Sequence, residues 1–131
     1  MIRILEDAPA VTKKLGTLVL QPMNGAQELR HWLYSHGWHV ADESLAVADG
    51  RIYEIIQARR GRRTMPSALD LLVGPVLWEK KPPLLRHNIE ALLFQLRRVL
   101  TGMEKSSRAQ ESRKYAQVKK QVMELEERLK W

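Results

Sequence analysis

The pair Pro82-Pro83 divides the chain into two parts with different hydrophobic periodicity. Proline fixes φ and removes a backbone donor, so a regular helix or central strand does not run through such a pair. Before it, short apolar runs and helical stripes alternate with turn signals; after it, apolar residues recur at spacings of three and four. A length of 131 residues suits one domain with an extension. We therefore expect a mixed α/β part followed by a helical part.

The α/β part contains a strand followed by a helix. Residues 17–21, "TLVLQ", form a continuous apolar run typical of a strand that is buried on both faces in a parallel sheet. Asn24-Gly25 then opens a predicted helix that runs to about His36. On its apolar face, Trp32 and Leu33 follow Leu29 at spacings of three and four. Strand, loop and helix follow in the order of an α/β unit.

A hairpin is predicted after this helix. Asp49-Gly50 stands between two runs with apolar residues, and this dipeptide suits a type I′ turn, which needs two positive φ angles. We expect Trp32, Trp38 and Tyr53 to belong to the core rather than to a base-stacking platform. Glu54 lies among apolar residues of the second strand, and alternation allows it to point to solvent.

Residues 1–7, "MIRILED", carry a helical stripe that Pro9 ends. No residue before this stripe could cap a helix. We therefore expect the chain to begin inside an element.

The helical part carries two heptad seams. The first is formed by Leu85, Ile89, Leu92, Leu96, Val99 and Met103, and the second by Tyr115, Val118, Val122, Leu125 and Leu129. Two such helices joined by a polar turn are predicted to fold back as an antiparallel coiled-coil hairpin. We divide the chain into an α/β part at 1–62, a linker with a short helix at 63–82, and the coiled-coil hairpin at 83–131.

The charge of the chain favours a polyanionic partner. The formal net charge is +7 and the sequence pI is about 10.0, and Lys and Arg release counterions when they neutralise phosphates. A basic surface with no partner is the alternative. The chain has no cysteine, which excludes disulfides and thiolate metal sites and suggests the reducing cytoplasm. No apolar run is long enough to cross a bilayer and no secretion signal is visible, so we expect no membrane partner.

The densest positive run is "ARRGRR". Its arginines, Arg59, Arg60, Arg62 and Arg63, have the forked donors that suit phosphate oxygens, and Gly61 would let the backbone approach closely. A solvated loop at a strand end is an equally simple interpretation. Lys80 and Lys81 add a second pair of candidate RNA-binding cations.

No catalytic or metal-binding constellation is complete. His31 and His36 are five residues apart, which does not place two ligands on one helix face, and no carboxylate stands at a metal-ligand spacing from them. Ser35, His36 and Asp42 lack the sequence of a nucleophile elbow. We expect surface histidines and no metal site, and the sequence identifies no catalytic residue.

Three spaced motifs nevertheless resemble one known family. "LVLQPMNGAQELRHWLYSHGW", "DESLAVADGRIYEII" and "VGPVLWEKKPPLL" occur in the order and spacing of the bacterial tRNA (adenine(22)-N1)-methyltransferase family. The resemblance extends over essentially the whole chain. Family members read Leu-Gln-Pro-Asn at the strand end, whereas here Met23 stands at the Asn position and Asn24 follows it.

This resemblance implies a fold and an activity. The fold is the C-terminal part of a class I methyltransferase, a Rossmann-like sheet that ends in an antiparallel hairpin and is followed by the coiled-coil arm. The activity is transfer of a methyl group from S-adenosylmethionine to N1 of an adenine in tRNA, by direct in-line displacement at the sulfonium. Gln21, Pro22 and Asn24 would then line the edge of the substrate and cofactor pocket, where ligands of open α/β sheets sit.

The resemblance also implies that part of the family fold is absent. No glycine-containing cofactor loop occurs in this sequence, so we expect the chain alone not to bind S-adenosylmethionine. A separate chain or self-association would have to cover the open sheet edge. The alternative function is a non-enzymatic RNA-binding or coiled-coil interaction module.

Overall fold

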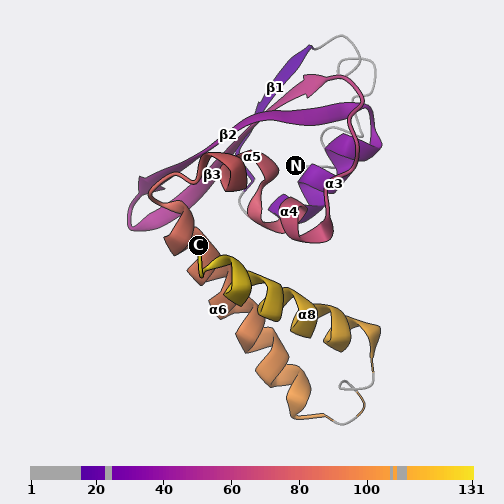
Figure 1. The fold of residues 1–131 in the computed structure, drawn as a ribbon, viewed down its shortest axis with the longest axis vertical. Helices are drawn as coiled ribbons and strands as arrows, with labels where there is room; N and C mark the ends of the chain where they lie inside the picture. The colour runs from indigo at the N-terminus through magenta and orange to yellow at the C-terminus, as the bar shows by residue number, and fades with distance from the viewer. Residues whose placement is uncertain (1–15, 23–24, 107, 109–111) are drawn as a thin grey trace. The chain divides into compact units, whose positions relative to one another are not determined.

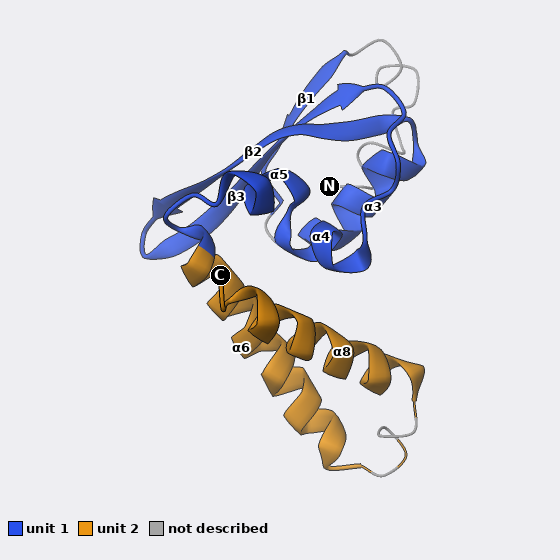
Figure 2. Ribbon diagram, in the orientation of Figure 1, with its two compact units in different colours: residues 1–85 blue, residues 86–131 orange. Residues whose placement is uncertain are grey.

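A computed structural model describes residues 16–22, 25–106, 108 and 112–131 (Figure 1). The helical stripe predicted at residues 1–7 lies outside this range. The chain divides into two compact units, Met1–Leu85 and Arg86–Trp131 (Figure 2).

The first unit contains a three-stranded antiparallel sheet. Its strands are β1 (Thr17–Leu20), β2 (Trp38–Ala48) and β3 (Arg51–Arg60), in the spatial order β1-β3-β2. At the turn between β2 and β3, Asp49 has φ 52° and Gly50 has φ 73°, the left-handed pair that the hairpin signal requires. The predicted hairpin is confirmed.

The strand predicted at residues 17–21 is present as β1, but its surroundings differ from the prediction. It pairs antiparallel with β3, from Thr17 opposite Arg59 to Leu20 opposite Ile56, and no parallel partner occurs among the described residues. Leu20 is buried, whereas Val19 is 70% exposed. Burial of this strand on both faces is therefore wrong for this chain, because only its inner face packs against the core.

One face of the sheet is covered by helices. The helices α3 (Ala26–Ser35), α4 (Ala68–Val73) and α5 (Pro75–Lys80) lie on the same side of it (Figure 1). The core between helix and sheet is formed by Leu20, Leu29, Trp32, Leu33, Trp38, Val40, Ile56 and Ala58. The predicted helix, its apolar face and the core positions of both tryptophans are confirmed.

The stretch 63–82, expected to be a linker with a short helix, contains two helices. Ser67 caps α4, since its Oγ accepts a hydrogen bond from the Asp70 amide at 3.1 Å. Gly74 ends α4, and Pro75 opens α5 at a position where a missing N–H costs nothing. The prediction found α4 but missed α5.

In the described part of the second unit, the helices are α6 (Leu85–Glu104), which begins one residue before it, and α8 (Arg113–Arg128). The start of α6 meets the end of α8, where Arg86 Nη1 donates to the Leu129 carbonyl at 2.7 Å. Farther along, Arg97 pairs with Glu126 at 3.4 Å. Towards the connecting turn the two helices diverge (Figure 1). None of the helices in the described chain is long and apolar enough to span a membrane.

The predicted heptad seams are only partly buried. Ile89, Val118, Val122 and Leu125 are buried, but Leu93 is buried at 3% exposure instead of the predicted Leu92, and Val99 is 44% exposed. The apolar side chains of the two helices are therefore better buried at the end of the pair that lies away from the turn.

Candidate functional site

The predicted pocket edge lies directly after β1. Gln21 is exposed and Pro22 is buried, so of these two residues the glutamine is the one available to a ligand. Asn24, the third predicted residue, lies outside the described residues, as does Met23.

The four candidate arginines lie at the end of β3. In the sheet register, Arg59 is opposite Thr17 of β1 and His39 of β2. The Arg60 guanidinium stacks over the Trp38 ring at 4.4 Å, a cation–π contact that holds it against a buried side chain. Arg62 and Arg63 follow Gly61 and are exposed. Arg59, Arg62 and Arg63 are therefore the arginines presented to solvent.

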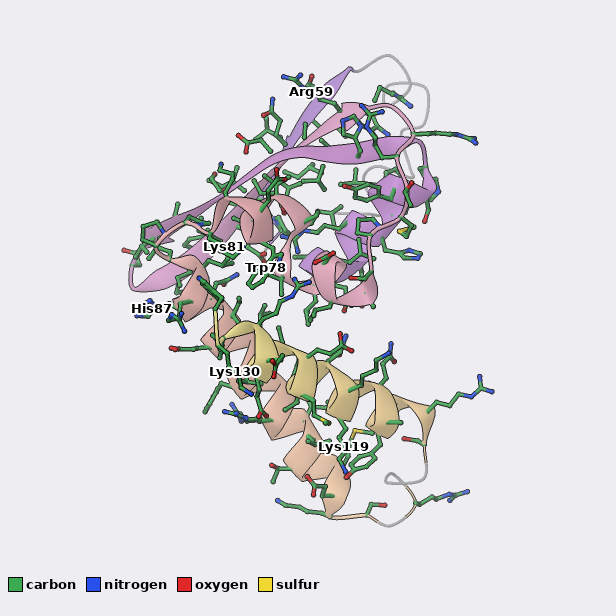
Figure 3. The ribbon with its side chains drawn as sticks, viewed as in Figure 1. Arg59, Trp78, Lys81, His87, Lys119 and Lys130 are labelled. Atoms are coloured by element: carbon green, nitrogen blue, oxygen red, sulfur yellow. The ribbon has the colours of Figure 1, made fainter. Side chains whose placement is uncertain are left out.

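Lys80 and Lys81 lie elsewhere, at the end of α5, and Figure 3 labels Lys81 there. Lys80 Nζ is 3.0 Å from Asp42 Oδ1, and donates to the Glu43 carbonyl at 3.0 Å. Because it donates a hydrogen bond to the Asp42 carboxylate, Lys80 lowers the pKa of Asp42. Lys81 Nζ stacks over the Trp78 ring at 4.1 Å. Both lysines thus have partners within the first unit.

The structure does not bring the pocket edge and the arginines together. Arg59 is paired with the first residue of β1, whereas Gln21 follows the last. The ends of this four-residue strand are roughly 10 Å apart, since a strand rises about 3.3 Å per residue. A ligand that touches both would have to extend along the whole strand, as a nucleic acid does.

Sequence reasoning missed a buried charged group, the Arg30 cluster, formed by Arg30, Glu43 and Glu54. The Arg30 and Glu43 side chains are 0% exposed, and that of Glu54 is 15% exposed. Arg30 Nε donates to Glu43 Oε2 at 2.8 Å, and Nη2 donates to Glu54 Oε1 at 2.8 Å. The prediction that Glu54 points to solvent is wrong, because it faces this arginine.

All three nitrogens of the Arg30 guanidinium have an acceptor. Besides the two bonds above, Nη2 lies 2.7 Å from Glu43 Oε2. Nη1 donates to the carbonyls of Leu71 and Leu72, at 2.8 and 3.3 Å. The cluster therefore ties α3 to both hairpin strands and to the end of α4.

Glu43 extends the Arg30 cluster to α5. Its Oε1 accepts hydrogen bonds from the amides of Val76 and Leu77, at 2.9 and 3.3 Å. Burial raises the pKa of Glu43, although Arg30 and these amides oppose the rise. Burial also acts to lower the pKa of Arg30, but the two carboxylates outweigh it and the net pKa is raised. The arginine is therefore firmly charged.

Gly74 allows the α4–α5 connection to approach this cluster. Its φ is 109°, and an added Cβ would lie 2.9 Å from both Arg30 Nη2 and Glu43 Oε1. Real Cβ contacts essentially never come this close, so only glycine fits here without displacing a charged group.

His31 lies on α3, and His36 is the residue that caps its C-terminal end. Within the described ranges, no group of three or more His, Asp or Glu side chains could hold a metal ion. His31 and His36 are exposed as predicted, and the His36 ring stacks on Trp32 at 4.1 Å.

Comparisons with known proteins show which family the chain resembles. The family model for tRNA (adenine(22)-N(1))-methyltransferase matches residues 1–127. A Bacillus subtilis protein of that name is 35% identical over 69 residues, which cover 49% of this chain and 29% of the relative.

Solved structures extend the similarity to nearly the whole chain. A putative tRNA (m1A22) methyltransferase from Streptococcus pneumoniae, in complex with S-adenosyl-L-methionine, has a TM-score of 0.79 at 26% identity, covering 98% of this chain and 54% of its own. The Bacillus subtilis m1A22 tRNA methyltransferase has a TM-score of 0.70 at 25% identity, with the same coverage. The chain thus spans about half the length of these structures.

Proposed function

Because the chain belongs to the tRNA (adenine(22)-N(1))-methyltransferase family, we propose that it forms part of an enzyme that methylates N1 of an adenine in tRNA, with S-adenosylmethionine as the methyl donor. The observation that carries this proposal is the family match over residues 1–127. A relative that is 26% identical was solved in complex with that cofactor.

We infer that the residues of this chain supply only part of a cofactor site. Gln21 and Pro22 supply one edge at the carboxyl end of β1, where ligands of α/β sheets bind, and we propose the same role for Asn24. The glycine-containing cofactor loop of the family does not occur in this sequence. We therefore propose that the chain alone does not bind S-adenosylmethionine, which titration calorimetry would test directly.

The RNA-binding role is assigned to the exposed arginines. Arg59, Arg62 and Arg63 lie together at one end of the sheet and are exposed, so phosphates can reach them. Arg60, Lys80 and Lys81 already have partners within the unit and would have to exchange them or bind with their remaining donors. Because N1 is on the pairing edge of adenine, the target base must leave its pairing and stacking in the complex.

The pair α6 and α8 is proposed as an antiparallel coiled-coil arm that touches tRNA. The burial of Ile89, Val118, Val122 and Leu125 supports helix pairing. Exposed cations at Arg97, Arg98, Lys119 and Lys120 support contact with phosphates. Substrate class and the absence of cysteine together support a cytoplasmic location.

The test measures RNA binding by the whole chain at several salt concentrations. Unmodified tRNA transcripts with adenine at position 22 should bind, and log affinity should fall linearly with log salt. A transcript whose position 22 is changed serves as the control for methylation. Binding that does not depend on salt would contradict the proposal. The alternative, a non-enzymatic RNA-binding module, would bind tRNA but give no methyl transfer when the rest of the family fold is supplied.

A further inference from the structure

Trp78 lies in the last turn of α5, and the side chain of Lys81 covers its ring. Figure 3 labels both side chains at this end of the helix. The Lys81 Nζ is 4.1 Å from the centroid of the ring and donates to the Trp78 carbonyl at 2.9 Å. The tryptophan is half-buried, whereas the lysine is exposed. The ring face under the ammonium therefore adjoins solvent.

The neighbouring residues of α5, and not Trp78, hold this helix in the first unit. The Leu77 side chain is fully buried. The Glu43 carboxylate accepts hydrogen bonds from the amides of Val76 and Leu77, at 2.9 and 3.3 Å. Trp78 is not among the buried residues of α5. An anchored helix thus presents this tryptophan at the surface.

The backbone of Lys81 has the left-handed conformation, with φ 48° and ψ 59°. Glycine is the usual residue at such a helix end, because a Cβ is strained there. Strained backbone of this kind is concentrated at ligand sites. The Lys81 amide closes α5 on the Leu77 carbonyl at 2.8 Å, and Pro82 and Pro83 fix the chain that follows. The lysine side chain can therefore leave the ring while its backbone stays in place.

A nucleobase and an ammonium can exchange on the same aromatic face. Proteins that bind single-stranded RNA place its bases on aromatic rings and its phosphates on cations. A cation–π contact at an exposed site is weak, so a base can displace the ammonium at little cost. The displaced ammonium stays close enough to neutralise a phosphate of the same strand.

We propose that Trp78 is a stacking platform for an unpaired base of RNA, and that Lys81 is its displaceable cover and a phosphate ligand. The proposal rests on the RNA-binding part of the proposed function, and not on the methyl transfer.

The test compares a single-stranded RNA of about ten nucleotides with an RNA duplex of the same length. Fluorescence anisotropy measures the binding of each to the whole chain. The bases of a duplex are already stacked on one another, so only the single strand can use the platform. Trp78→Leu should weaken single-strand binding at least about fivefold and change duplex binding less than about twofold. Trp78→Phe keeps an aromatic face and should restore most of the single-strand affinity.

Trp131 provides a matched control. Its ring lies under the Arg86 guanidinium at 4.5 Å and it is 41% exposed, so it forms the same kind of pair in the second unit. Arg86 also donates to the carbonyls of Leu129 and Trp131, at 2.7 and 3.0 Å, and these bonds hold it over the ring. Trp131→Leu should leave the affinities for both RNAs unchanged.

Salt dependence separates the roles of the two residues. Stacking releases no counterions, so Trp78→Leu should leave the slope of log affinity against log salt unchanged. Lys81→Asn removes the charge and introduces a residue that tolerates the left-handed conformation. This variant should reduce the slope for the single strand by about 0.7, the value for one phosphate.

Three results would overturn the proposal. Two concern the platform: equal losses of single-strand and duplex binding in Trp78→Leu, or no loss of either. The third is an unchanged slope in Lys81→Asn, which would remove the lysine from the phosphate contact. Selective loss of single-strand binding in Trp78→Leu, without methyl transfer by the parent once the rest of the family fold is supplied, would uphold the platform and refute the methyltransferase. Methyl transfer by the parent, with no effect of Trp78→Leu on RNA binding, would do the reverse.

Discussion

Arg30 Nη2 lies 2.7 Å from Glu43 Oε2, and neither side chain is exposed to solvent. The pair joins α3 to β2, and each partner continues the contact elsewhere: Arg30 to Glu54 and Leu71, Glu43 to the first amides of α5. A buried pair of this kind adds little net stability over apolar residues of the same shape, but losing one partner leaves a buried charge unmatched. A single change in this pair should therefore destabilise the first unit.

Replacing the arginine should destabilise the first unit strongly. Arg30→Met leaves two carboxylates without their cation and should lower the free energy of unfolding by about 3–5 kcal/mol. Urea denaturation followed by tryptophan fluorescence measures this change. Arg51→Met, at an exposed position, is the control and should stay within about 0.5 kcal/mol of the parent. Equal stabilities of the two variants would refute a structural role for the cluster.

Glu43 and Asp42, the two neighbouring acids of β2, should change the stability of the first unit in opposite directions as pH rises. Burial raises the pKa of Glu43 above its reference value of 4.5. The contribution of Glu43 to stability is therefore fully present below pH 4.5. It is lost as pH rises through the raised pKa of the folded state. The pKa of Asp42 is lowered by Lys80, so its contribution is present above 3.8 and is lost as pH falls through the lower folded-state value.

Stability measured from about pH 3 to about pH 8 separates these two effects. Glu43→Gln should remove the part of the profile that falls with rising pH, and Asp42→Asn the part that rises. The Asp42 effect should be small, because its pair with Lys80 is half exposed. Parallel changes in the two variants would contradict the opposite pKa directions.

Adding a methyl group at Gly74 should destabilise the first unit more than the small size of the group suggests. Gly74→Ala forces a side chain into φ 109° and towards the Arg30 cluster. The backbone strain costs about 1–3 kcal/mol, and overpacking adds a similar amount. Gly102→Ala is the matched control, since an added Cβ there meets no atom within 4 Å and alanine favours the interior of α6. Thermal unfolding should show a loss for the first variant and no loss for the second.

The arginine run should carry a measurable share of the salt dependence of tRNA binding. The double change Arg62→Ser with Arg63→Ser should weaken binding and reduce the slope of log affinity against log salt by about 0.7–0.9 for each phosphate that is no longer neutralised. Arg51→Ser removes the same kind of charge at the opposite end of β3 and is the control. Fluorescence anisotropy at several salt concentrations compares the variants. Identical slopes would remove these arginines from the RNA-binding surface.

Local patterns predicted most of the elements. The Asp49-Gly50 turn, the helix with its Leu29 and Leu33 face and the strand at 17–20 depend on neighbours in the sequence, and the structure contains all three. The missed α5 is a six-residue helix, too short to show a clear period. Heptad spacing likewise predicted two helices but not their divergence towards the turn, because spacing shows which face is apolar and not how far it is covered.

The Arg30 cluster was missed because its partners lie 13, 24 and 41 residues away in the sequence. One signal was available. Strand alternation places Glu54 on the same face as Ile56 and Ala58, both of which are fully buried. An acid on the core face of a strand needs a buried cation, and Arg30 stands within the apolar stripe of the preceding helix.

The relation between the two candidate ligand-binding regions also could not be predicted. The sequence places Gln21 and Arg59 near strand ends but does not state the direction in which their strands pair. The strand at 17–21 was expected to lie in a parallel sheet, whereas β1 runs antiparallel to its neighbour β3. That pairing carries the arginines to the beginning of β1 and leaves the glutamine at its end.

The convergence of five separate elements on one buried ion pair bears on how the first unit comes apart. Arg30 and Glu43 are excluded from water only when α3, β2, β3, α4 and α5 are all in place. If any one of these elements detaches, water reaches the two charged side chains and weakens their contacts with the other elements. Slow amide exchange in these elements should consequently share one opening free energy, and the unit should melt as a single cooperative foldon.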